Sequence, residues 1–218
     1  MLFRSHAPKT LEPIWFEWLT LAGLFFFCTW LLGVKGVWQL LFTSDPTGIT
    51  LVIVVVFVVA TLWCGVRARE LARERDLLED AIVRGPSPLG HAGWAADYWA
   101  SLRHPDQASS ALDVLLERTH GIHSTAWWVN GVQLKLGLLG KVIGFSILAM
   151  QIGQIQNFDP AQSQELLRSL TTGLGVALLT TMVGLVGNIL LGLQLTRLDR
   201  YADALVTRAQ QHALTLPR

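Results

Sequence analysis

Charged side chains are scarce in this sequence: Asp, Glu, Lys and Arg make up only 15% of its 218 residues. Soluble domains carry about 25% of such residues. Hydrophobic residues account for 51%, and the mean hydropathy is +0.42. This composition indicates a membrane protein. The net charge is +1 and the basic residues are mixed with acids, which argues against a basic stripe that follows nucleic-acid phosphates.

Cysteines and catalytic motifs are also scarce. The 2 cysteines, Cys28 and Cys64, both lie in apolar runs, which argues against a disulfide framework. The sequence has no GxSxG, HExxH or P-loop pattern and no Cys/His pair typical of nucleophilic catalysis. We therefore predict that the chain is not an enzyme and binds no cofactor.

One pair of histidines has a spacing that metal sites use. His120 and His123 stand three residues apart, so a helix would place them on one face. Only Glu117 lies near them in the sequence, no cysteine completes the set, and we expect a loop to begin at His123. We therefore predict no metal site at this position.

Four segments are long and apolar enough to cross a bilayer, which takes about 20 residues. They are 15–42, 48–66, 134–155 and 169–196. The polar segment between the second and third opens with an amphipathic helix that continues the second span. It is broken by GPSPLG at 85–90 and resumes as a helix over about 91–120. The predicted fold is all-α, a polytopic membrane protein with four transmembrane helices, two of them extended by cytoplasmic helices.

This organisation divides the chain into five regions. They are a cytoplasmic N-terminal tail (1–13), a first transmembrane pair (14–66), a cytoplasmic helical segment (67–127), a second transmembrane pair (128–198) and a cytoplasmic C-terminal helix (199–218). Lys and Arg accumulate on the cytoplasmic side of bilayers. All of them except Lys35, Lys141 and Arg168 fall in or beside the regions assigned to the cytoplasm. Both termini are therefore predicted to be cytoplasmic.

The last two spans differ from the first two, which are apolar on all sides and suit contact with lipid. Small and polar residues recur in them at helical spacing: Gly137, Gly140 and Gly144, then Gly173, Ala177, Thr180, Thr181, Gly184, Asn188 and Gly192. Small residues let membrane helices approach closely, so the glycines and Ala177 are predicted to pack helices together. The threonines and Asn188 favour a wet or partner-facing surface, although a threonine hydroxyl can also bond to its own helix.

Acidic residues are absent from the interior of all four spans. None lies within 18–44, 46–69, 118–158 or 166–198. A proton relay through a bilayer needs a titratable group inside the span, usually a carboxylate. If protons cross the membrane through this protein, another polypeptide must therefore supply the acid.

Two stretches resemble the last two spans of the MotA/TolQ/ExbB proton-channel family: LGLLGKVIGF at 136–145 and GLGVALLTTMVGLVGNILL at 173–191. The resemblance covers about residues 133–200, and the order of spans is similar to the MotA-like topology. It implies a multi-pass protein of the bacterial inner membrane, assembled as a homopentamer around a dimer of a single-span partner of the MotB/TolR/ExbD type. In that family the partner helix carries an aspartate, and proton passage drives rotation of one component within the other.

The resemblance also assigns roles by position. The family's fourth-span threonine falls on Thr181, whereas its third-span threonine falls on Lys141. The glutamate found early in the last span of ExbB-like members falls on Val176, and a later proline falls on Leu190. This chain therefore departs from the family pattern at three of these four positions.

These assignments predict a set of residues that face an ion pathway: Thr181, Thr180, Lys141 and Asn188. For Lys141 the alternative is snorkelling, in which the ammonium group reaches back to the cytoplasmic interface. The leading hypothesis for function is a channel or stator subunit of a membrane motor driven by the proton motive force. The competing hypothesis is a non-conducting structural scaffold of the same fold in an envelope complex.

Overall fold

The computed structural model describes residues 14–39, 45, 47–84, 93–153 and 160–215, and the regular secondary structure within these ranges is all helical. The helices are α1 (Ile14–Val34), α3 (Ile49–Arg84), α4 (Gly93–Leu102), α5 (Pro105–Gly153) and α6 (Pro160–Ala213). All except α4 are long and apolar enough to cross a membrane. This confirms the prediction of an all-α chain with four helices able to span a bilayer. The predicted tail (1–13) and helix breaker (85–90) lie outside the described residues.

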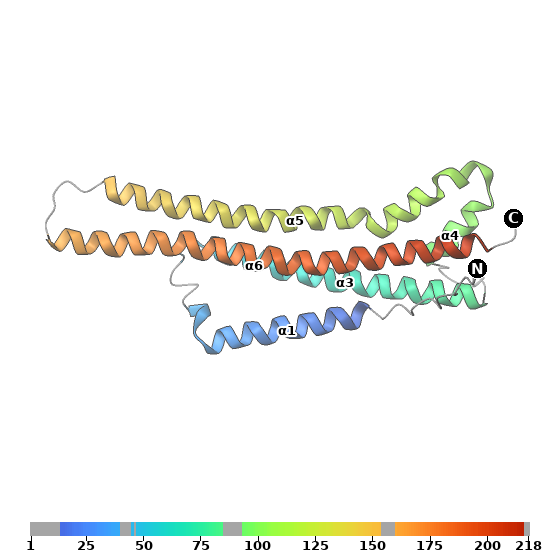
Figure 1. Cartoon of the computed structure of the whole chain (residues 1–218), viewed down its shortest axis with the longest axis horizontal. Helices are drawn as coiled ribbons and strands as arrows, with labels where there is room; N and C mark the ends of the chain where they lie inside the picture. Colours follow the sequence, from blue (N-terminus) through green and yellow to red (C-terminus); the bar gives the residue numbers. More distant parts are fainter. Residues whose placement is uncertain (1–13, 40–44, 46, 85–92, 154–159, 216–218) are drawn as a thin grey trace, which may run out of the picture.

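Three of these helices are longer than a bilayer requires. α3 has 36 residues, α5 has 49 and α6 has 54. At 1.5 Å per residue α6 measures about 80 Å, against about 30 Å for the hydrocarbon core of a membrane. We use "spanning parts" for their apolar portions, 49–66, 134–153 and 170–196. The polar parts 67–84 of α3, 105–133 of α5 and 197–213 of α6 lie at the same end of the molecule, and α6 begins at the opposite end (Figure 1).

The helices form a unit of three with a fourth at its side. α5 and α6 run side by side, α3 lies along α6, and α1 contacts mainly α3 (Figure 1). The indole ring of Trp18 in α1 lies against Gly65 of α3 so closely that no side chain would fit there. Phe26 and Trp30 of α1 are 75% and 58% exposed. α1 is therefore a peripheral helix whose outer surface suits lipid contact.

A capping aspartate fixes the start of α3. Asp45 is buried, and its carboxylate accepts hydrogen bonds from the backbone N–H groups of Thr50 (2.7 Å) and Thr47 (2.9 Å). Such a cap satisfies free N–H groups at a helix N-terminus and stabilises the helix by about 1 kcal/mol. Asp45 is the one acidic residue of the sequence between residues 18 and 69, and this cap occupies its carboxylate.

The polar segment differs from the prediction in two places. The sequence predicts one helix over 91–120, but α4 ends at Leu102 and α5 begins at Pro105. Proline disfavours the helical conformation at the preceding residue, His104, and suits the first turn of a new helix. The loop predicted to begin at His123 is also wrong, because α5 is continuous from Pro105 to Gly153.

The short helix α4 closes the polar end of the three-helix unit. The backbone N–H of Trp94 donates a hydrogen bond to the Glu74 carboxylate of α3 (2.8 Å). The indole N–H of Trp99 donates to the carbonyl of Ala209 in α6 (2.9 Å). These bonds hold α4 against α3, the helix that precedes it, and against α6, which is distant in the sequence.

Candidate functional site

The spanning parts of α5 and α6 meet in a close contact that we call the glycine seam: Gly137, Gly140 and Gly144 of α5 against Gly173, Ala177, Thr180 and Gly184 of α6. A methyl group built on Gly144 would lie 2.8 Å from both the Gly173 carbonyl oxygen and the Ala177 backbone nitrogen. One built on Gly184 would lie 2.9 Å from the Cα of Gly137. Lipid tails are as apolar as side chains, so membrane helices gain association energy from such backbone contact.

Thr180 and Thr181, the two threonines predicted to face an ion pathway, lie at this seam. Thr180 is fully buried against Gly140, and its hydroxyl donates a hydrogen bond to the carbonyl of Val176 (2.8 Å). Thr181 is half-buried, and its hydroxyl lies 2.7 Å from the Ala177 carbonyl and 3.3 Å from that of Gly137 across the seam. Both hydroxyl groups therefore bond to helix carbonyls inside the α5–α6 pair.

Buried amides continue this contact toward the polar end. The side-chain N–H of Asn188 in α6 donates to the backbone carbonyl of Asn130 in α5 (2.8 Å). Gln133 is fully buried beside Gly187, and both polar atoms of its side chain lack a hydrogen-bond partner among the described residues. The sequence analysis named Asn188 but missed Asn130 and Gln133. Asn130 and Gln133 stand three residues apart just before an apolar run, and this spacing is the signal that could have found them.

Lys141 lies apart from this group, on a surface of α5 that is exposed in the single chain. Its Nζ is 5.9 Å from the centroid of the Phe145 ring, a distance at which a cation is attracted to an aromatic face. Its apolar neighbours Leu138 and Val142 are 49% and 61% exposed. Of the four residues predicted to face one pathway, the structure therefore brings three to the α5–α6 contact and places the fourth elsewhere.

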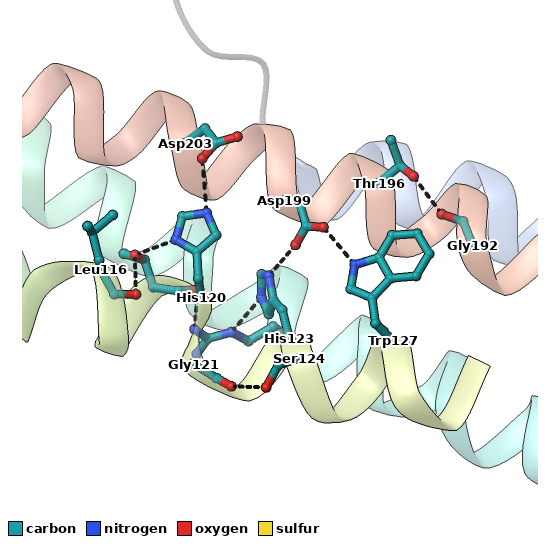
Figure 2. Close-up of polar contacts among 12 residues, drawn as sticks. Leu116, His120, Gly121, His123, Ser124, Trp127, Gly192, Thr196, Asp199 and Asp203 are labelled. Atoms are coloured by element: carbon teal, nitrogen blue, oxygen red, sulfur yellow. Dashed lines mark hydrogen bonds and ion pairs between the residues drawn. The ribbon is translucent and has the colours of Figure 1, made fainter. Parts of the chain in front are cut away.

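Beyond the spanning parts, charged residues join the helices. We call this group the ionic cluster: Arg67, Glu70, His120, His123, Asp199 and Asp203. Asp199 of α6 lies between two residues of α5, with His123 Nδ1 at 2.6 Å from one carboxylate oxygen and the Trp127 indole N–H donating to the other at 2.8 Å (Figure 2). One turn further along, His120 Nε2 lies 3.0 Å from the Asp203 carboxylate. These contacts connect α5 to α6 where the glycine seam has ended.

Arg67 attaches α3 to the same place. Its side chain is 3% exposed, and its guanidinium donates to the carbonyl oxygens of Arg118 (2.8 Å) and Thr119 (2.9 Å) in α5. Its Nε donates to His123 Nε2 (3.2 Å), and it pairs with Glu70 at 2.6 Å. One buried cation thus binds two backbone carbonyls, an imidazole and a carboxylate, which is the planar recognition that arginine provides.

These bonds fix the proton of His123. A guanidinium N–H can only donate, so His123 Nε2 must accept, and the imidazole is neutral with its proton on Nδ1, facing Asp199. Burial lowers the pKa of His123 below its ordinary value of 6.5, and the positive charge of Arg67 adds to that effect. The Asp199 carboxylate acts in the opposite direction without reversing the shift.

The sequence analysis weighed His120 and His123 as metal ligands and predicted no metal site there. In the structure each faces its own aspartate, and the described residues contain no group of three or more His, Cys, Asp or Glu able to hold a metal ion. The aspartates stand four residues apart on α6 and the histidines three apart on α5, and either spacing places both members of a pair on one helix face. These two spacings together are a sequence signal for the two His–Asp contacts, and the sequence analysis missed it.

Comparisons with known proteins add no further assignment. No family model, curated protein or solved structure matches this chain.

Proposed function

We propose that this chain is a channel or stator subunit of a membrane motor driven by the proton motive force. It forms a ring around a single-span partner that supplies the membrane carboxylate. The observation that carries the proposal is the absence of acidic residues from the spanning parts 49–66, 134–153 and 170–196. A proton path across a bilayer needs a titratable group, so a second polypeptide must contribute it. The resemblance of 136–145 and 173–191 to the MotA/TolQ/ExbB spans supports the same assignment.

The surface of α6 supports assembly into a ring. One face of its spanning part is covered by α5, whereas Leu178, Met182 and Ile189 on another face are 59%, 54% and 65% exposed. In a homopentamer this face meets the neighbouring subunit or the partner helix, and α1 faces lipid. A native mass spectrum of the chain in mild detergent should show a pentamer, and a stable monomer would contradict the ring.

The proposed location is the bacterial inner membrane, with both termini and the polar parts 67–84, 105–133 and 197–213 in the cytoplasm. The distribution of Lys and Arg supports this direction. In a background of Cys28→Ser and Cys64→Ala, a cysteine at exposed Gln164 should react with an impermeant maleimide added outside spheroplasts. A cysteine at exposed Arg103 should react only after permeabilisation. The reverse pattern would refute the direction.

Proton flux is the direct test of function. The chain is co-expressed with the product of a neighbouring gene that encodes one N-terminal span with an aspartate followed by a periplasmic domain. Proteoliposomes with a pH-sensitive dye should show flux only when both proteins are present, and Asp→Asn in the partner should abolish it. A complex that forms without any flux would refute the motor and support the scaffold.

One observation favours that second candidate, a non-conducting scaffold of the same fold. The hydroxyl groups of Thr180 and Thr181 already bond to carbonyls within the α5–α6 pair, and Lys141 places a positive charge where the family has a threonine. A ring of lysines repels cations. Flux that appears only in a Lys141→Thr variant would assign the native protein to this class.

A further inference from the structure

One of the hydrogen bonds that attach α3 to α5 depends on a single proton position. Arg67 Nε donates to His123 Nε2 across 3.2 Å, and this bond exists only while that nitrogen carries a lone pair. Both residues are 3% exposed, so water does not replace the bond. The charge of His123 therefore decides whether α3 and α5 attract or repel each other at this point.

We propose that His123 is a proton-binding switch, and that its protonation breaks the Arg67–His123 bond and moves α3 and α5 apart at this point, while α3 stays packed on α6. The inference does not depend on the proposed function, because it concerns contacts within one chain. The ligand is the proton, and the elements that respond are the polar parts of α3 and α5.

Protonation acts on the two neighbours of His123 in opposite ways. A proton on Nε2 would face the Arg67 Nε–H, so two donors and two positive charges would meet at 3.2 Å. On the other side, the imidazolium would bind Asp199 more strongly through the existing 2.6 Å contact. The α5–α6 contact therefore persists while the bond between Arg67 and His123 is lost.

The other charged groups around His123 set the pH of this change. Arg67 of α3, which is paired with Glu70, and His120 of α5, whose ring centroid is 5.8 Å away, disfavour an added charge; Asp199 of α6 favours it. Asp203 reaches the site only through His120. Burial is the largest influence and lowers the pKa of His123 below 6.5. The Arg67–His123 bond is therefore complete above pH 6.5 and is lost as the pH falls through the lowered pKa of His123.

The loss of this bond would also change the shape of α5. The guanidinium that binds His123 also binds the carbonyl oxygens of Arg118 and Thr119, and α5 bends within its polar part (Figure 1). Mid-helix carbonyls that accept an extra hydrogen bond accompany such bends. When Arg67 withdraws, the polar part of α5 loses the group that holds it toward α3.

Spin-label distances in the full chain test the proposal. In a cysteine-free background in lipid nanodiscs, diluted with unlabelled chain, one pair of labels at Val83 and Leu116 reports α3–α5. A second pair at Leu116 and Thr207 reports α5–α6; all three positions are exposed. Between pH 7.5 and 5.0 the first distance should lengthen with a midpoint below 6.5, and the second should stay constant. A first distance that is constant, or a second that lengthens equally, would overturn the switch.

Two glutamine variants make the test specific. In His123→Gln the amide can donate to Asp199 and accept from Arg67 without charge, so the α3–α5 distance should stay short at every pH. His120→Gln, three residues away on the same helix, should respond as the native chain does. A native response in His123→Gln would refute the assignment to His123. As a check that needs no change at His123, Asp199→Asn should move the transition to lower pH, and a shift upward would also refute it.

Discussion

The spanning and polar halves of the α5–α6 pair are held together by opposite means. In the glycine seam the backbones touch, with Gly144 and Gly173 leaving no room for a methyl group. In the ionic cluster the side chains of His123 and Asp199 meet at 2.6 Å. Lipid provides no hydrophobic drive between helices, so the spanning half depends on close packing, whereas the polar half can use charge. We therefore expect the polar half, and not the spanning half, to respond to pH.

The same contrast separates contacts that stay fixed from contacts that can change. The hydroxyl group of Thr180 donates a hydrogen bond to a carbonyl of its own helix. Protonation therefore breaks no bond of the seam at this residue. Arg67, by contrast, contacts α5 through groups that include a titratable imidazole. One half is thus suited to keeping α5 and α6 together, and the other to changing how α3 meets them. Four substitutions test this division, in order of expected effect.

Removing Arg67 should have the largest effect. Arg67→Leu removes the donor that binds His123 Nε2 and two backbone carbonyl oxygens of α5. Each buried acceptor left without its donor costs roughly 1 kcal/mol or more, so we expect the free energy of unfolding to fall by about 3 kcal/mol. Arg197→Leu is the matched control, because Arg197 is 54% exposed in its 3.3 Å pair with Glu17 and should lose about 1 kcal/mol or less. Denaturation in mild detergent measures both, and equal losses would contradict the special position of Arg67.

Replacing Lys141 tests the proposed partner. If Lys141 meets the partner's carboxylate, Lys141→Met should weaken the complex by about 2 kcal/mol or more, roughly thirtyfold in affinity, and abolish flux. The subunit's own unfolding should barely change, because Lys141 is exposed in the single chain. Lys135→Met, six residues earlier and also exposed, is the control. Unchanged partner binding and flux in Lys141→Met would leave snorkelling as the explanation.

A single methyl group tests the glycine seam. Gly144→Ala places Cβ 2.8 Å from backbone atoms of α6, which cannot move as a side chain can, and should cost about 1–3 kcal/mol. Gly175→Ala, in the same spanning part of α6, meets no atom within 4 Å and should be neutral or slightly stabilising. Thermal unfolding in detergent compares them. Similar melting temperatures would show that the seam is looser than its contacts indicate.

The smallest change in stability is expected at Thr181. Thr181→Val keeps the shape but removes a hydroxyl that bonds to Ala177 and Gly137, at a cost of about 0.6 kcal/mol. Assembly should survive, while proton flux through the complex should fall if the hydroxyl serves the pathway. Thr172→Val, exposed on the same helix, should keep full flux. Full flux in Thr181→Val would assign Thr181 to packing alone.

The fold was predictable because its signals are local. Runs of about 20 apolar residues identify spans by composition, and each of α1, α3, α5 and α6 overlaps one predicted segment. The largest difference is at α1, which ends at Val34 instead of at the predicted residue 42. The break between α4 and α5 was missed although Pro105 carries its signal, because the apolar periodicity of 91–120 was given more weight. Likewise, a loop was predicted to begin at His123, whereas α5 continues through this residue and the two after it.

The site was less accessible to sequence analysis. The seam residues share a periodic stripe, and their spacing led to them. Arg67, His123 and Asp199 lie on three different helices, and their meeting depends on how these helices cross, which no periodicity within one helix encodes. Gln133 was missed for a related reason, since only the packing of α5 on α6 makes a single glutamine fully buried.

The unbroken length of α6 gives the molecule a mechanical property. The helix continues without interruption from the seam to Ala213, 29 residues beyond Gly184, or about 44 Å. A rigid rod of that length acts as a lever, so a tilt of about 5° at the seam displaces its far end by about 4 Å. Trp99 is bonded to Ala209 near that end, so α4 would travel with the lever. Movements too small to open the seam would thus be large where the chain meets the aqueous phase.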